Sequence, residues 1–530
     1  MQTTFSHRAD HQVKKDFMKR IKAILEEVIT SSTQGESVRG LEKQVWRALL
    51  EIGQLLLALA LNIRCRQATE QDIKERGLDQ KDVKLRNESD YWYCLTTTFG
   101  PVRFFSYAYR DLSTVGGTVT RVPARKEVVP LYSRTHSSEL CLEWESRLGA
   151  EQPFRKAQEA LSYFSHGAVQ LEDTTIARHM VTAAKLIDPD WLYRDPEDIR
   201  TLLRERASRD TETEQPVLYL STDAHALRRY VDETWDAQWK MANGIRLWCV
   251  DRNNGAIIHL GGEYTWGDCE EVADIIERLV MSGHLAEDGD YGDGVSAKLV
   301  VIVDGAPWIE NHVLPQVPWA VSILDAYHAL EHVSDYAAIR FGKGSREATD
   351  FYDDVVHCLL GRSATRKKKP KKRKGHKKRH RGRSESAEAI RTYAGGVLAP
   401  MRMTGPEKVL DFLILDDLPE TKKHEKARDS LVNYFEENRY RMDYILYRTR
   451  GYQIGSGAME SLHRTASQAR LKIPGGRWLE ETSQAIFNLR MMAMVGKWGE
   501  FWNQPDLTDQ LIEAFNERKD AAKEDVQEAA

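Results

Sequence analysis

The sequence predicts an α/β protein, and two features between residues 213 and 345 support this fold class. LVVIVDG (299–305) begins with five apolar or β-branched residues in a row, a pattern typical of a strand that is buried on both faces of a sheet. VLYLSTD (217–223) is a second run of this kind, and the two runs lead to Asp304 and Asp223. Because such a sheet is covered by helices, we expect helical segments between the strands.

The other elements of this region follow in an informative order. IRLWCVDRNNGAIIHLGG (245–262) predicts two strands joined by an Asn-Asn-Gly turn. TWGDCEEVADIIERLVMSG (265–283) predicts a helix with Asp268 as its N-cap, and AVSILDAYHALEHV (320–333) predicts a short strand followed by a helix. Three consecutive strands before the alternation of helices and strands are typical of a ribonuclease H-like domain, whose first part we place at 213–345.

The segments before this domain are predicted from periodicity and composition. We expect an N-terminal helical region (1–75), a β-rich segment (76–135) and a helix-turn-helix-like DNA-binding region (136–190). In the last of these, Arg178 and Lys185 lie on the second helix, which would enter the major groove. The alternative is a plain packing unit of helices.

A basic tract lies in the helical and polar stretch that follows the predicted ribonuclease H-like region at 213–345. RKKKPKKRKGHKKRHRGR (366–383) contains 13 Lys and Arg and no acidic residue, although the whole chain has a net charge of −4. This charge density favours contact with a nucleic acid, and the alternative is a solvated, disordered loop. The residues expected to contact DNA here are Lys367, Lys368, Lys371, Arg373 and Lys377.

The N-terminus, the most apolar stretch and the cysteine spacing indicate a cytosolic protein. The N-terminus lacks the apolar segment of a signal peptide, and the most apolar stretch, residues 48–63, contains Glu51 and Gln54 and is predicted to be a buried amphipathic helix. The six cysteines show no metal-ligand spacing, which favours reduced thiols. We therefore expect a cytoplasmic protein with no membrane partner.

Three acids are candidates for one metal site. Asp223 and Asp304 follow neighbouring strands, and Glu460 begins a helix after the glycine-rich GYQIGSGAME, with Ser456 as a plausible N-cap. A few carboxylates suffice to hold two Mg²⁺ ions on a phosphate, with Mn²⁺ as the expected substitute, and this arrangement supports phosphodiester hydrolysis or strand transfer. The alternative is that the aspartates cap turns and Glu460 complements its helix dipole.

Four motifs carry a family resemblance. STDAH around Asp223, VDGAPWI around Asp304, DAYHALEH after the next strand and RTRGYQIGSGAMESLHRTASQARLKIPGGRW around Glu460 resemble those of DDE transposases of bacterial insertion sequences. The resemblance is to the Kra-type group, which is related to the Mutator-like transposases. It extends from about residue 90 to residue 505 and is most specific in the last two motifs.

The resemblance implies roles for particular residues. Asp223, Asp304 and Glu460 would be the metal-binding catalytic triad, and Asp325 and His328 match an Asp-x-x-His signature. His328 would approach the scissile phosphate or organise the site. Its alternative role is that of a partly buried helical histidine that is satisfied by a carboxylate.

The resemblance also implies a domain layout, with two departures from the family. The ribonuclease H-like catalytic domain would be interrupted by an all-helical insertion (346–445) and would resume at 446–505, followed by a C-terminal tail (506–530). The chain lacks the N-terminal cysteine pair of some relatives. It also has Thr-Asp-Ala-His at Asp223, where relatives more often have Asp-Gly.

Basic and aromatic residues follow the third acid. Trp478, Trp498 and Trp502 could stack on a flipped base, but their spacing favours a packed helix face. The basic residues expected along a DNA backbone are Arg464, Arg470, Lys472 and Arg477.

The predicted function is that of a DNA transposase. By the resemblance, the protein would bind the double-stranded ends of its element, release a 3′-hydroxyl and join it to target DNA, as a homodimer or higher oligomer in the bacterial cytoplasm, associated with the nucleoid. Two alternatives stay open. One is a ribonuclease H-like nuclease without strand transfer, and the other is a domesticated, non-catalytic DNA-binding protein.

Overall fold

The computed structural model describes residues 7–33, 37–78, 83–85, 92–105, 108–112, 119–121, 137–231, 236–361, 405–414 and 421–528. The chain divides into two compact units, one formed by Met1–Trp191 with Glu481–Ala530 and the other by Leu192–Glu480. The basic tract at 366–383 lies outside the described residues, and so do the five DNA contacts predicted in it, Lys367, Lys368, Lys371, Arg373 and Lys377.

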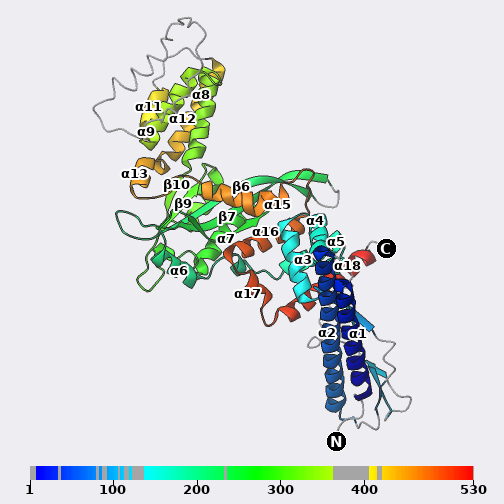
Figure 1. Ribbon diagram of the computed structural model, residues 1–530. Helices are drawn as coiled ribbons and strands as arrows, with labels where there is room; N and C mark the ends of the chain where they lie inside the picture. Colours follow the sequence, from blue (N-terminus) through cyan, green and yellow to red (C-terminus); the bar gives the residue numbers. More distant parts are fainter. Residues whose placement is uncertain are drawn as a thin grey trace, which may run out of the picture. The chain divides into compact units, whose positions relative to one another are not determined.

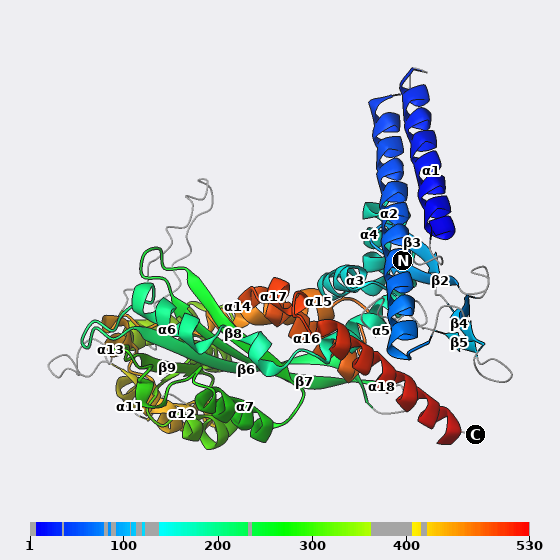
Figure 2. The ribbon, with the colours of Figure 1, turned by 90° about the horizontal axis from the view of Figure 1, so that it is seen from below.

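The first unit begins with two long helices, α1 (His7–Thr33) and α2 (Val38–Glu75), which lie side by side (Figure 2). Arg20 of α1 donates to Glu51 of α2 at 2.9 Å. Strands β2 (Trp92–Thr97) and β3 (Gly100–Phe105) form an antiparallel hairpin that packs on α2. The short strands of the other sheet, in the order β1-β4-β5, are β1 (Val83–Leu85), β4 (Ala108–Asp111) and β5 (Val119–Arg121).

Helix α2 is less buried than its sequence predicts. Within the apolar stretch at 48–63, Leu49 and Leu56 are 55% and 51% exposed, because α1 and the β2–β3 hairpin cover only part of the helix surface. By length and composition, α2 is the one helix among the described residues that could cross a membrane. Core helices of soluble proteins pass the same test, and α2 packs Leu61 and Cys65 against the hairpin.

The rest of the first unit is helical. Its helices are α3 (Glu139–Glu151), α4 (Phe154–Phe164), α5 (Asp173–Ala184), α16 (Glu480–Val495), α17 (Trp498–Trp502) and α18 (Leu507–Glu528). Helices α4 and α5 occupy the predicted helix-turn-helix, but residues 165–172 connect them, which is longer than the usual turn of three or four residues. Helix α5 is largely buried and packs against α3, α4 and α18. The structure therefore favours the packing-unit alternative for this helix pair.

The second unit is built on a five-stranded mixed sheet with the strand order β10-β9-β6-β7-β8. Its strands are β6 (Val217–Val231), β7 (Asp236–Val250), β8 (Ile257–Thr265), β9 (Lys298–Val303) and β10 (Val321–Leu324). Strand β7 is antiparallel to β6 and to β8, whereas β9 is parallel to both β6 and β10. This sheet, with its element order of three strands before the first covering helix, is consistent with a ribonuclease H-like core.

Local sequence signals place several elements of the second unit. The predicted turn between β7 and β8 contains Gly255 with φ 72°, and Asp268 caps α7 (Cys269–Met281) by accepting two backbone N–H bonds at 3.0 and 3.2 Å. Strand β6, however, does not end at Asp223 as predicted. It continues to Val231 because its ladder with β7 extends that far, beyond the end of β9.

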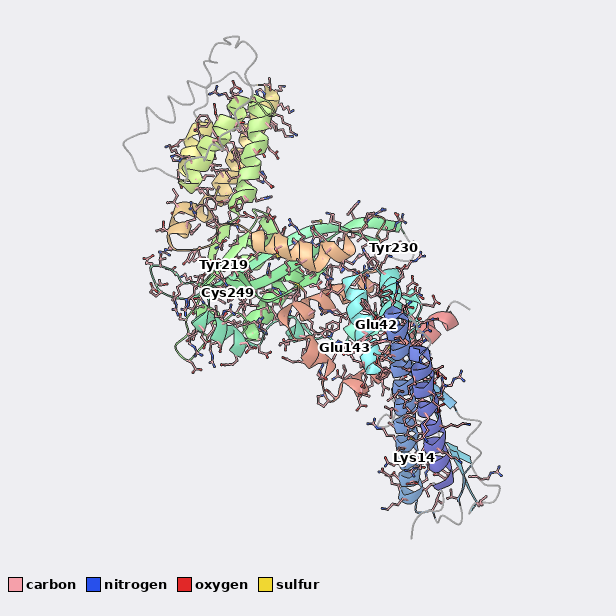
Figure 3. The ribbon with its side chains drawn as sticks, viewed as in Figure 1. Lys14, Glu42, Glu143, Tyr219, Tyr230 and Cys249 are labelled. Carbon is pink, nitrogen blue, oxygen red and sulfur yellow. The ribbon has the colours of Figure 1, made fainter. Side chains whose placement is uncertain are left out.

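The described part of residues 346–445 is helical. Helices α8, α9, α11 and α12 lie together (Figure 1), and their apolar core is continuous with one face of the sheet. Tyr219 of β6, labelled in Figure 3, belongs to this core and stacks on Trp248 with ring centroids 4.2 Å apart. The helical elements of the second unit outside α7 are α6 (Pro196–Glu205), η5 (Glu287–Gly289), η6 (Ile309–Val313), η7 (Leu314–Gln316), α8 (Ala326–Phe341), α9 (Arg346–Leu360), α11 (Pro406–Ile414), α12 (Lys422–Asn438), η9 (Arg439–Arg441), α13 (Tyr444–Thr449), α14 (Gly457–Leu462), η10 (His463–Gln468) and α15 (Ala469–Leu471), among the described residues.

Candidate active site

Two of the three predicted acids lie near the end of the parallel ladder between β6 and β9. The parallel ladder between β6 and β9 ends with Leu220 opposite Val301. Three residues beyond this last pair come Asp223, inside β6, and Asp304, one residue past the end of β9. Because neighbouring strands are about 4.8 Å apart, this placement brings the two acids close together where β9 ends.

The electrostatics of Asp304 reflect this proximity. Its side chain is half-buried, and its Oδ1 accepts a hydrogen bond from the N–H of Ala306 at 3.0 Å. Burial raises the pKa of Asp304 above its ordinary value, and the negative charge of Asp223 raises it further, against the lowering by the Ala306 hydrogen bond. Positive charge on His328 or Arg441 also lowers the pKa of Asp304. A divalent cation would relieve the repulsion between the two aspartates.

Asp223 is also in contact with a histidine. Its side chain is 38% exposed, and its Oδ1 accepts the N–H of Ala224 at 2.7 Å. Its Oδ2 lies 3.3 Å from Nε2 of His463, which is buried. His463 directly follows helix α14 (Gly457–Leu462), which contains the third predicted acid, Glu460.

Helix α14 packs against strands β6 and β7. Arg246 of β7 donates a hydrogen bond to the backbone carbonyl of Ala458, which ties the helix to the sheet. Glu460 is exposed and lies three residues before His463, and residues three apart are neighbours on a helix surface. The structure therefore brings Glu460 to within one helical turn of a residue that contacts Asp223.

The fit of a divalent metal to these residues is partial. Asp223 and Asp304 supply the carboxylate oxygens that Mg²⁺ prefers. Within the part of the chain that the structure describes, no group of three His, Cys, Asp or Glu side chains is close enough to hold a metal ion. The assembled donors are thus the two aspartates, and Glu460 would become a third ligand only if its exposed side chain turned toward them.

Asp325 connects the sheet to the loop that precedes α14. It follows β10, is buried, and caps α8 by accepting the N–H of Tyr327 at 2.8 Å. Its other carboxylate oxygen accepts hydrogen bonds from the N–H of Ser456, at 3.1 Å, and from the Ser456 hydroxyl. Ser456 is the N-cap residue of α14 as predicted, but its side chain bonds Asp325 and not the helix backbone. Asp325 is therefore a structural link between α8 and α14.

His328 lies on α8, near Asp304. Its side chain is 40% exposed, and its ring meets that of His332 edge to face at 5.0 Å. Its Nδ1 is 3.8 Å from a carboxylate oxygen of Glu331, which is too long for a hydrogen bond. Because positive charge on His328 lowers the pKa of Asp304, the two side chains interact electrostatically.

The basic residues that follow α14 divide into two groups. Arg464, Lys472 and Arg477 are exposed and can meet a phosphate backbone. The prediction for Arg470 as a surface DNA contact is wrong, because Arg470 is fully buried with its guanidinium 4.7 Å from the ring centre of Trp478. Trp478 is itself buried, as the core interpretation predicts.

In the first unit, Arg178 and Lys185 are both exposed, although the helix that carries them is largely buried. Arg178 extends toward Thr175 with a long contact of 3.4 Å, and Lys185 follows the last turn of α5. Trp502 is buried, and Trp498 donates its ring N–H to Glu143 at 2.8 Å. Both tryptophans therefore belong to the packing of this unit.

Sequence reasoning missed the residues that hold His463. Tyr264 of β8 places its hydroxyl 3.0 Å from Nδ1 of His463, and His225 of β6 places its ring 4.3 Å from the His463 ring, between centroids. The spacing of Glu460 and His463 was a visible signal, since residues three apart share a helix face. Tyr264 and His225 had no comparable signal, because their roles depend on which strands are neighbours.

Comparisons with known proteins add little to this geometry. No protein-family model and no curated protein matches the chain. A solved structure described as a Drosophila P element transposase strand transfer complex matches 71% of this chain and 94% of that chain, with 12% sequence identity and a TM-score of 0.28. A match with so low a score carries no weight in assigning a fold or a function.

Proposed function

We propose that this protein is a DDE transposase that cuts and joins DNA strands at the ends of a bacterial insertion sequence of the Kra-type group. The observation that carries the proposal is the parallel register of β6 and β9, which places Asp223 and Asp304 close together beyond its last pair, with the helix of Glu460 packed against the strand of Asp223. The family motifs at these three acids support the same assignment. The partner in this proposal is double-stranded DNA, both as element ends and as target.

In this proposal the three acids hold two Mg²⁺ ions, for which Mn²⁺ substitutes. Bound metal supplies activation of the attacking oxygen and stabilisation of the leaving oxygen on a phosphodiester. Asp223 and Asp304 bind from the sheet, and Glu460 completes the ligand set from α14. His328, on the α8 side of Asp304, is the residue proposed to approach the scissile phosphate.

The surrounding residues position the DNA. Arg464, Lys472 and Arg477 are exposed after Glu460 and would contact phosphates. Synapsis of two element ends requires at least two copies of the chain, so a homodimer or higher oligomer is part of the proposal. A cytoplasmic, nucleoid-associated location follows from the same function.

The test is a strand-transfer assay with purified protein, labelled DNA that carries the inverted repeats flanking the gene, a target plasmid, and Mg²⁺ or Mn²⁺. We expect cleavage that leaves a 3′-hydroxyl and a joined product, and loss of both in Asp304→Asn and Glu460→Gln. Glu500→Gln, an exposed glutamate of α17, is the matched control and should behave like the parent.

Each outcome separates the candidates. Cleavage without joined product favours a ribonuclease H-like nuclease. Binding of the repeats without cleavage in either metal favours a non-catalytic DNA-binding protein. Retention of full activity in both acid variants refutes the proposed site.

A further inference from the structure

A buried histidine, hydrogen-bonded to a buried tyrosine, lies against the carboxylate of Asp223. We infer that His463 is a positioning residue: it orients the Asp223 carboxylate for metal binding and couples the helix of Glu460 to the sheet. This inference rests on the proposed function, because it gives His463 a role only if Asp223 is a metal ligand. His463 itself is not proposed to touch metal or substrate.

The contacts of His463 define which of its ring nitrogens carries the proton. Tyr264 is buried, and burial raises the pKa of its hydroxyl, so the phenol keeps its proton. The hydroxyl lies 3.0 Å from Nδ1 of His463 and can donate to it. Nε2 then carries the ring proton on the side of Asp223, whose Oδ2 lies 3.3 Å away. The opposite tautomer would set a lone pair against the carboxylate, which is repulsive.

A second histidine, His225, packs beside His463. The ring of His225 lies 4.3 Å from that of His463, and its Nε2 is 2.6 Å from the hydroxyl of Ser467. Ser467 belongs to the π-helical turn η10 (His463–Gln468), so this bond also attaches the segment after α14 to strand β6.

A glycine of β7, Gly244, leaves space for the His463 ring. Gly244 pairs with Asp223 across the β6–β7 ladder. A Cβ atom at Gly244 would lie 3.0 Å from a ring carbon of His463 and 2.8 Å from one of Tyr264. The absence of a side chain at this position is therefore what allows His463 to reach Asp223.

The test compares two substitutions of His463 that each retain a different property of the side chain. His463→Phe keeps a ring but has no donor, whereas His463→Gln loses the ring but retains an N–H donor near the position of Nε2. A positioning role predicts that Mn²⁺ affinity, measured by calorimetric titration of the full chain without DNA, falls about 10- to 100-fold in His463→Phe and is partly restored in His463→Gln. A packing role predicts the reverse order.

Three further variants make the result decisive. His259→Gln changes another histidine of the same unit, on β8, and should leave Mn²⁺ affinity unchanged. Tyr264→Phe removes the hydroxyl that selects the tautomer and should weaken Mn²⁺ binding in the direction of His463→Phe. Asp304→Asn should abolish specific binding. Thermal unfolding of each variant, followed by circular dichroism, shows whether it folds.

The two levels of the proposal fail in different ways. If Asp304→Asn binds Mn²⁺ as well as the parent does, the metal site and the proposed function fail together. If Asp304→Asn loses binding but His463→Phe, folded, binds like the parent, only the positioning role is overturned. A His463→Gln affinity below that of His463→Phe also overturns it.

Discussion

Replacing Gly244 by alanine tests how closely the helix of the third acid must approach the sheet. The added Cβ would lie 2.5 Å from Cε of Met459, 2.8 Å from Cε1 of Tyr264 and 3.0 Å from Cε1 of His463. The terminal methyl group of Met459 can move aside. The rings of Tyr264 and His463 are buried, so they can move only if β8 or the segment that begins with α14 shifts. Overpacking of this kind costs about 1–3 kcal/mol.

The consequence is measurable in stability and in local opening. For a unit of this size, each kcal/mol lowers the melting temperature by about 2–4 °C. Gly244→Ala should therefore melt several degrees below the parent, and hydrogen exchange should accelerate in peptides covering 457–471. Because the shift displaces His463 from Asp223, Mn²⁺ affinity should fall as well.

Gly457→Ala is the matched control in the helix itself. A Cβ there meets no atom within 4 Å, and alanine is favoured over glycine in a helix by up to about 1 kcal/mol. Equal melting temperatures and equal exchange for Gly244→Ala and the parent would refute the close approach. So would a destabilisation of Gly457→Ala as large as that of Gly244→Ala.

Three other predictions follow from contacts in the second unit. Burial raises the pKa of Asp210, but hydrogen bonds from Tyr452 and from two backbone N–H groups outweigh it and leave the pKa below its ordinary value. Asp210→Ala should therefore lower the free energy of unfolding by about 1–3 kcal/mol at pH 7. In chemical denaturation this difference from the parent should shrink as pH falls through the folded-state pKa, and a pH-independent difference would contradict the prediction. Asp325→Ala should increase hydrogen exchange around Ser456 and lower stability by about 1–3 kcal/mol, and unchanged exchange there would count against its linking role. For the exposed Arg464, Arg464→Ala should reduce the slope of log binding constant against log salt for double-stranded DNA by about 1 and leave the melting temperature unchanged. For the buried Arg470, Arg470→Met should lower the melting temperature. The opposite pattern would show that the burial of the two arginines is misassigned.

Local patterns were sufficient for the strands and for the helix starts. The five-residue apolar run before Asp304 forms β9, and Asp268 caps α7, because both features depend on residues adjacent in sequence. The end of β6 was predicted too early. Its extension past Asp223 depends on pairing with β7, and a residue pattern within β6 alone does not report the length of its partner.

Burial of polar and apolar side chains was harder to predict. Arg470 was predicted to be exposed, like the other basic residues after Glu460, yet it is fully buried against Trp478. Leu49 and Leu56 read as core, yet each is about half exposed. In both cases burial depends on which elements fold over the side chain, and the residue pattern of the segment itself does not specify this.

The sequence by itself determined the kinds of element, their order and the three acids that could serve one site. Tertiary structure alone decided that Asp223 and Asp304 lie close together, that His463 rather than Glu460 touches Asp223, and that Gly244 leaves room for this contact. The physical reason is range. Strand and helix formation respond to neighbours a few residues away, whereas strand register and helix docking depend on residues distant in the sequence, such as Leu220 with Val301 in the parallel ladder and His225 with Ser467 at the docked helix.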